Sequence, residues 1–167
     1  MPEAALAEKA GLGARGRHNL LITKKYGSWV FLGEIVTTAS LPVITPAERF
    51  DLQCDACGAC VRACPAGALG DDFDKTKCLS SITQKKGELT PGEVSLMQKT
   101  GTAWGCDLCQ EACPHNQNTA IEPLSEFLQE PVARITENSL TVGRAYAWRG
   151  EKIVRRNAAV CGMARGE

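Results

Sequence analysis

The chain has 167 residues, with 19 basic and 19 acidic side chains. This zero formal net charge excludes a globally basic nucleic-acid-binding surface, so binding of that kind would need a local patch. No apolar run is long enough to span a membrane, and the mixed-charge N-terminus is not a signal peptide. The nine cysteines therefore indicate a reducing, cytoplasmic setting, where metal ligation is their commoner use.

The N-terminal segment is predicted to form one helix and two strands. Residues 2–10 favour a short helix because they are rich in alanine and leucine and are followed by glycines. Residues 19–23 and 29–38 are predicted to be strands joined by a hairpin-like turn at 24–28. The second strand is nearly all apolar, which is typical of a sheet buried on both faces.

These elements are too few to bury a core by themselves. We therefore interpret residues 1–45 as the C-terminal end of a larger α/β domain. Its missing strands would come from another chain or from sequence upstream of Met1. A proline-punctuated linker follows, and the remaining chain is expected to form a cysteine-rich domain over residues 46–117 and a helical tail over 118–167.

The cysteine-rich domain contains two related cysteine runs. The run from Cys54 to Cys64, followed by a proline, has the C-x2-C-x2-C-x3-C-P spacing of bacterial iron–sulfur sites. In such a run the first three cysteines hold one cubane and the fourth ligates the other. The run from Cys106 to Cys113 has the same spacing without its first cysteine, because Ala103 stands there.

Ligand counting completes two cluster sites. Two [4Fe-4S] clusters need about eight thiolates, and the two runs supply seven. Cys78, between the runs, is predicted to be the eighth ligand, and Cys161 is left free. The predicted ligands of cluster 1 are Cys54, Cys57, Cys60 and Cys113. The predicted ligands of cluster 2 are Cys64, Cys78, Cys106 and Cys109.

Zinc ligation and a disulfide framework are two alternative uses of these cysteines. Zinc also binds C-x2-C pairs, although four closely spaced cysteines with a trailing proline suit a cubane better. A disulfide framework requires an oxidising compartment, and nothing in the sequence indicates secretion.

Helices are predicted in the remaining sequence. The residues from Thr90 provide an N-cap, a first-turn proline and a carboxylate at the third position, which predicts a helix over 91–98. Further helical segments are expected at 122–128, 139–150 and 151–162. The basic side chains of this tail form either a solvated face or a phosphate-contacting patch for RNA.

Several segments resemble the epoxyqueuosine reductase family. They are residues 7–13, 16–22 and 26–35, the cysteine runs with 113–116, and 148–160. The resemblance places Cys78 on a family cluster ligand. It implies a cobalamin-dependent enzyme that reduces epoxyqueuosine to queuosine in the tRNA anticodon loop, with electrons passing through two [4Fe-4S] clusters to cobalamin. The implied partners are tRNA and an external electron donor such as a flavodoxin or ferredoxin.

The resemblance also assigns cofactor contacts. The residues expected near cobalamin are Arg17, Gly27, Ser28, Phe31, Gly33 and Ser80. The family's proton-donor aspartate would lie upstream of Met1, so no catalytic residue is expected in this chain. His18 is interpreted as a surface or core histidine, and His115 as packing against the cluster loop rather than ligating iron.

The expected fold class is α+β. It comprises a two-cluster bacterial ferredoxin-like domain, preceded by the end of an α/β cobalamin-binding domain and followed by a short helical tail. Two other hypotheses stay open: a stand-alone double-cluster electron carrier that binds no corrin, and a non-functional remnant.

Overall fold

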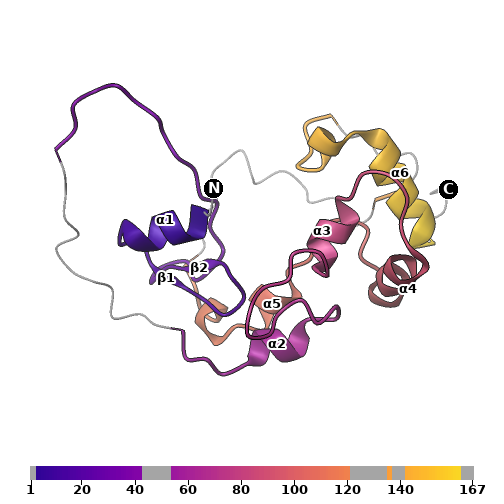
Figure 1. The fold of residues 1–167 in the computed structure, drawn as a ribbon, viewed down its shortest axis with the longest axis horizontal. Coiled ribbons are helices and arrows are strands. Elements are labelled where there is room, and N and C mark those ends of the chain that lie inside the picture. Colours follow the sequence, from indigo (N-terminus) through magenta and orange to yellow (C-terminus); the bar gives the residue numbers. More distant parts are fainter. Residues whose placement is uncertain (1–2, 43–53, 121–134, 137–141, 163–167) are drawn as a thin grey trace. The chain divides into compact units, whose positions relative to one another are not determined.

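The structure is a computed structural model that describes residues 3–42, 54–120, 135–136 and 142–162 (Figure 1). The chain divides into two compact units, and each combines separate stretches of sequence. The first unit comprises Met1–Ala63 and Leu108–Glu122, and the second comprises Cys64–Asp107 and Pro123–Glu167.

The first unit is built from short helices and one small sheet. Its helices are α1 (Glu3–Lys9), α2 (Ala59–Ala63), α5 (Leu108–Glu111) and the 3-10 helix η1 (Pro114–Asn116). Strand β1 (Ala14–Arg15) pairs antiparallel with β2 (Leu21–Ile22). Helix α1 lies against both strands (Figure 1) and buries Ala7. The predicted helix over residues 2–10 is therefore confirmed.

The predicted strand over residues 29–38 is wrong. Residues 29–42 contain no helix or strand, and Phe31 and Val36 are each 96% exposed. A strand needs a neighbouring strand to pair with, and burial of both its faces needs elements packed above and below the sheet. The sheet found in the described part of the chain has only β1 and β2, so this apolar run has nothing to pair with there.

The turn predicted at residues 24–28 does form. Thr23 and Gly27 make an antiparallel bridge in which each amide donates to the other residue's carbonyl, at 2.7 and 3.1 Å. The turn leads back from β2, but the chain then leaves the sheet. The hairpin of this unit is therefore β1–β2 and lies earlier in the sequence than predicted.

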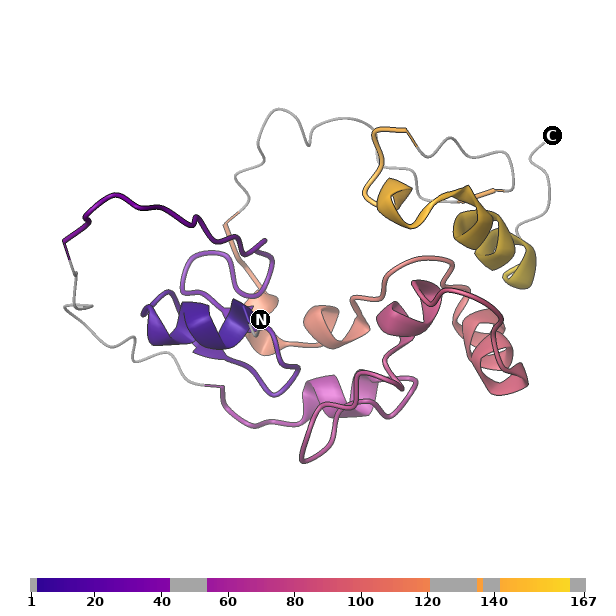
Figure 2. The same cartoon turned by 45° about the horizontal axis from the view of Figure 1, so that its top comes forward.

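The second unit is mainly helical. Its elements are α3 (Leu79–Thr83), α4 (Pro91–Thr100), the 3-10 helix η3 (Ala147–Arg149) and α6 (Glu151–Val160). Figures 1 and 2 both show α6 beside α4. Buried Leu79, Ile82 and Met97 join α3 to α4, while Val154 and Ala158 bring α6 against the loop at Ala103.

Two helices predicted in this unit are confirmed, and both have clear local causes. Helix α4 begins with a capping box, in which the Thr90 hydroxyl accepts from the Glu93 amide and the Glu93 carboxylate accepts from the Thr90 amide. It ends at Gly101, whose φ of 64° suits glycine. Helix α6 covers most of the predicted 151–162 segment.

Two further predictions concern the tail. The helix predicted at 122–128 lies outside the described residues. Within 139–150 the described residues contain only the 3-10 helix η3. In the described part of the chain, no helix has the length and apolar character needed to span a bilayer.

Candidate metal centre

Four cysteines line one hollow in the first unit. They are the predicted cluster 1 ligands Cys54, Cys57, Cys60 and Cys113. Cys54 and Cys57 lie in the loop that leads into α2, Cys60 lies in α2 itself, and Cys113 lies between α5 and η1. Helices α2 and α5 pack together, which brings the two cysteine runs to the same place although they are about fifty residues apart. The hollow gathers the four cysteines that the crossing rule assigns to cluster 1, and their ligation of a cluster stays a prediction.

The local backbone explains how the first loop turns its thiols inward. Ala56 and Gly58 have φ values of 50° and 72°, so the chain reverses tightly between Cys54 and Cys60. The side chain of Arg62 donates to the Cys57 carbonyl at 3.0 Å, which fixes the loop against α2. Small residues in such a loop leave room for backbone N–H groups to approach cluster sulfurs.

The thiols of this hollow interact electrostatically. Burial raises the pKa of Cys60 and of Cys113, and the neighbouring thiols at Cys54 and Cys57 raise both further. Four adjacent thiolates would therefore repel one another without a metal centre between them. A bound metal centre reverses this effect because its positive charge keeps coordinating thiols deprotonated.

The spacing of the cysteines favours an iron–sulfur cluster over a zinc ion. In the described residues, no three His, Cys, Asp or Glu side chains are placed to share one metal ion. Zinc needs its ligands about 2.3 Å from a single centre when they are thiolates. A cubane instead takes one cysteine on each of its irons, which lets four thiols line a shared hollow at wider separation.

The predicted cluster 2 ligands are divided between the two units. Cys64, Cys78 and Cys106 belong to the second unit, and Cys109 lies on α5 in the first. The Cys64 sulfur accepts a hydrogen bond from the Ala68 amide at 3.3 Å. Cys78 occupies the position before the first turn of α3, and its side chain makes no capping hydrogen bond. This ligand set stays a prediction.

Asn157 ties together the segments that carry Cys78 and Cys106. It is fully buried, and its amide donates to the carbonyls of Thr83 at 2.6 Å and Ala103 at 2.8 Å. The Thr83 hydroxyl in turn accepts from the Gly105 amide at 3.1 Å. Sequence reasoning missed this role, although an asparagine on the apolar stripe of α6 is the signal that could have revealed it.

Cys161 lies in the packing between α4 and α6. Its thiol donates to the Met97 carbonyl at 3.8 Å, and burial raises the pKa of the Cys161 thiol. Both features favour a protonated, structural cysteine. They support the prediction that Cys161 is not a cluster ligand.

The two histidines both line the cysteine hollow. His115 packs against the cluster loop, as predicted, and its Nε2 lies 3.2 Å from a carboxylate oxygen of Asp55. His18 is only 4% exposed. It is a buried residue of the metal centre, a placement that the sequence did not predict.

The residues predicted to contact cobalamin lie in different environments. The Ser28 amide donates to Asn116 Oδ1 at 2.6 Å, and the Ser28 hydroxyl accepts from the Asn116 amide at 2.8 Å and donates to Gln110 at 2.9 Å. A Cβ at Gly27 would come within 2.2 Å of Asn116 Oδ1. Gly27 and Ser28 therefore fasten the N-terminal turn to the loop after Cys113.

The other predicted contacts do not form a cradle in the described part of the chain. Arg17 lines the cysteine hollow, Phe31 is almost fully exposed, and a Cβ at Gly33 would meet nothing within 4 Å. Ser80 belongs to the second unit, where its hydroxyl accepts from Gln84. Cobalamin contact by these residues stays a prediction.

Comparison with known proteins shows which family the chain resembles. Residues 53–116 match the family described as a 4Fe-4S double cluster binding domain. The chain is 37% identical to epoxyqueuosine reductase from Listeria monocytogenes, over 96% of this chain and 45% of that protein. It is 42% identical to the Aliivibrio fischeri protein of that name, over 75% of this chain and 33% of that protein. The chain is thus similar to epoxyqueuosine reductases over nearly its whole length.

Solved structures show the same similarity. An epoxyqueuosine reductase from Streptococcus thermophilus superposes with a TM-score of 0.73 at 30% identity, covering 95% of this chain and 44% of that one. Another, solved with an epoxyqueuosine-modified tRNA-Tyr stem loop, has a TM-score of 0.70 at 26% identity, covering 95% of this chain and 45% of that one. The chain spans less than half the length of these epoxyqueuosine reductases.

Proposed function

We propose that this chain is the iron–sulfur part of an epoxyqueuosine reductase, which delivers electrons for the reduction of epoxyqueuosine to queuosine in tRNA. The observation that carries the proposal is the hollow lined by Cys54, Cys57, Cys60 and Cys113 within the double-cluster domain. These thiolates would bind cluster 1, and Cys64, Cys78, Cys106 and Cys109 would bind cluster 2. The tRNA substrate is proposed because a structural relative was solved with a modified tRNA stem loop.

The protein's part in this reaction is to hold and insulate the redox centres. The helix pair α2–α5 fixes cluster 1, and the Asn157 network fixes the segments around Cys78 and Cys106. Cobalamin, where bound, would supply the cobalt centre that opens the epoxide. It enters the proposal through family resemblance, and no residue of this chain is assigned the role of proton donor.

Metal content tests the proposal directly. The protein is reconstituted anaerobically with iron and sulfide, incubated with cobalamin, and analysed for iron, sulfide and cobalt. We expect about eight irons per chain, as two cubanes require. Cys113→Ser is expected to lose only cluster 1, whereas the matched control Cys161→Ser keeps both clusters. Loss of iron from the control, or zinc in place of iron, would contradict the ligand assignment.

A stand-alone electron carrier is the alternative function. The open backbone at Phe31 and Gly33 favours it, because those residues form no corrin cradle in the described part of the chain. This alternative predicts full iron content without cobalt, and no turnover of epoxyqueuosine-containing tRNA. Stoichiometric cobalt would exclude it. Absence of both iron and cobalt would favour a non-functional remnant.

The electron donor is proposed to dock on a basic hollow of the second unit. This hollow has one acidic lining residue, Glu93, and four basic ones: Lys75, Lys85, Lys86 and Arg149. Trp148, 64% exposed, also lines it, with the Arg149 guanidinium stacked 3.9 Å from its ring centre. Lys75 precedes the predicted ligand Cys78 by three positions, so an acidic flavodoxin or ferredoxin bound here would lie near cluster 2.

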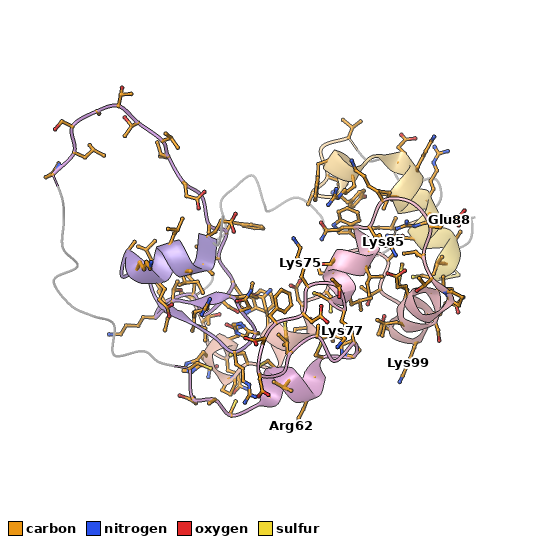
Figure 3. The ribbon with its side chains drawn as sticks, in the orientation of Figure 1. Arg62, Lys75, Lys77, Lys85, Glu88 and Lys99 are labelled. Carbon is orange, nitrogen blue, oxygen red and sulfur yellow. The ribbon has the colours of Figure 1, made fainter. Side chains whose placement is uncertain are left out.

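Charge reversal tests the docking surface. Lys75 and Lys85 are labelled beside α3 in Figure 3, whereas Lys99 projects from α4 away from them. At low salt, Lys75→Glu is expected to slow the second-order reduction of the clusters by a reduced flavodoxin by about tenfold. Lys99→Glu is the control and should change it little. If Lys75→Glu leaves the reduction rate unchanged but weakens binding of an anticodon stem loop, the hollow is assigned to RNA.

A further inference from the structure

His18 forms part of the wall of the cluster 1 hollow. Its side chain is 4% exposed and lies in the tight turn between β1 and β2. Gly16 makes room for the ring, because a Cβ there would come within 2.6 Å of His18 Cε1 and 3.0 Å of Nδ1. The turn therefore holds the imidazole in one position against the cysteine loop.

The hydrogen bonds of His18 define which nitrogen carries the proton. Nδ1 accepts from the Leu20 amide at 3.2 Å, so it bears no proton. An unprotonated Nδ1 makes the ring a neutral imidazole, and burial, followed by the nearby His115, lowers the pKa of His18 in the same direction. A neutral imidazole with a bare Nδ1 carries its proton on Nε2. His18 therefore presents an N–H donor at Nε2.

This donor has no protein acceptor among the described residues. Nε2 of His18 is buried and makes no hydrogen bond there. Buried N–H groups are nearly always satisfied, and an unsatisfied one in a native structure indicates a missing partner. The hollow that His18 lines is shared with the four predicted ligands of cluster 1. Nε2 of His115, the other histidine of the hollow, is likewise buried without a hydrogen bond, but a carboxylate oxygen of Asp55 lies 3.2 Å from it.

We propose that His18 Nε2–H donates a hydrogen bond to a sulfur of cluster 1 and thereby raises the reduction potential of that cluster. The inference rests on the proposed function, because it requires a cluster at Cys54, Cys57, Cys60 and Cys113. Hydrogen bonds to cluster sulfurs withdraw electron density and stabilise the reduced state. His18 is thus a tuning residue that acts through the cluster, and it is not an iron ligand.

The test is a redox titration of reconstituted protein, monitored by electron paramagnetic resonance. His18→Phe keeps a planar ring but removes the donor. At a fixed potential, we expect the ratio of reduced to oxidised cluster 1 to fall about tenfold, equivalent to about 59 mV for one electron. Cluster 2 serves as the internal control and should not shift. His18→Gln retains an amide donor and should restore part of the potential.

Isotope labelling keeps the proposal testable if His18→Phe does not take up its iron–sulfur clusters. In wild-type protein labelled with 15N-histidine, pulsed electron paramagnetic resonance of reduced cluster 1 should detect a magnetic coupling between the cluster and a histidine nitrogen. The coupling should persist in His115→Phe. Its absence from the wild type, or an unchanged potential in a fully loaded His18→Phe, would overturn the inference. Wild-type protein that binds no iron would instead overturn the proposed function, so the two failures are distinguishable.

Discussion

Substitution of Asn157 should destabilise the second unit strongly. Its side-chain amide donates to two carbonyls in the interior, those of Thr83 and Ala103. Asn157→Ala leaves both acceptors without this donor, and each unsatisfied buried group costs about 1–3 kcal/mol. The free energy of opening around α3 and α6 should therefore fall by about 2–6 kcal/mol. That is a large share of a stability that is typically about 5–15 kcal/mol for a whole domain.

Amide hydrogen exchange on cluster-loaded protein measures this effect, because it reports local opening free energies. Peptides from α3, α4 and α6 should lose protection in Asn157→Ala. Asn157→Asp should behave similarly, since a carboxylate keeps the size but cannot donate. The control is Arg155→Ala, whose exposed ion pair with Glu151 contributes about 0–1 kcal/mol. Protection in Asn157→Ala within about 0.5 kcal/mol of wild type would refute the reasoning.

Three smaller predictions concern other contacts. Gly27→Ala should lower the free energy of unfolding by about 1–2 kcal/mol or more, because Gly27 has a φ of 56° and the new Cβ would clash with Asn116. A melting midpoint equal to that of the wild type would contradict this. Thr90→Ala removes the helix cap and should lower protection of the first turn of α4 by about 1 kcal/mol, whereas Thr90→Ser should not. Burial alone would raise the pKa of Glu93, but hydrogen bonds from Thr90 and Lys85 outweigh it and hold that pKa below 4.5. The stabilisation by Glu93 is therefore present above its unfolded pKa and lost as the pH falls through its folded pKa. Protection of α4 against amide hydrogen exchange should therefore decrease in the wild type as the pH falls through that pKa, and should not do so in Glu93→Gln.

The features that the sequence predicted correctly have local causes. The first cysteine run is a spacing pattern, and cubane geometry requires that spacing within one short loop. Helix α4 has its cap, its first-turn proline and its terminal glycine in consecutive sequence. The gathering of Cys113 with the first run was also predictable, because the crossing rule for double-cluster sites specifies that long-range contact.

The features that the sequence did not predict depend on distant partners. An apolar run such as 29–38 has the composition of a buried strand, but a strand exists only where another strand pairs with it. The hydrogen bonds of Asn157 reach Thr83 and Ala103, 74 and 54 positions away. Nothing in the residues beside Asn157 identifies those acceptors. The burial of His18 likewise depends on the packing of its turn against the cysteine loop.

The contact between Ser28 and Asn116 changes how experiments on cofactor binding must be interpreted. Ser28 is predicted to contact cobalamin, yet its amide and hydroxyl also hold the segment that follows Cys113. Substitution of Ser28 can therefore disturb cluster 1 before it affects any corrin. Loss of cobalt in a Ser28→Ala protein indicates a corrin contact only if the iron of cluster 1 is retained. Where iron and cobalt are lost together, the loss of the hydrogen bonds between Ser28 and Asn116 is sufficient to explain both losses.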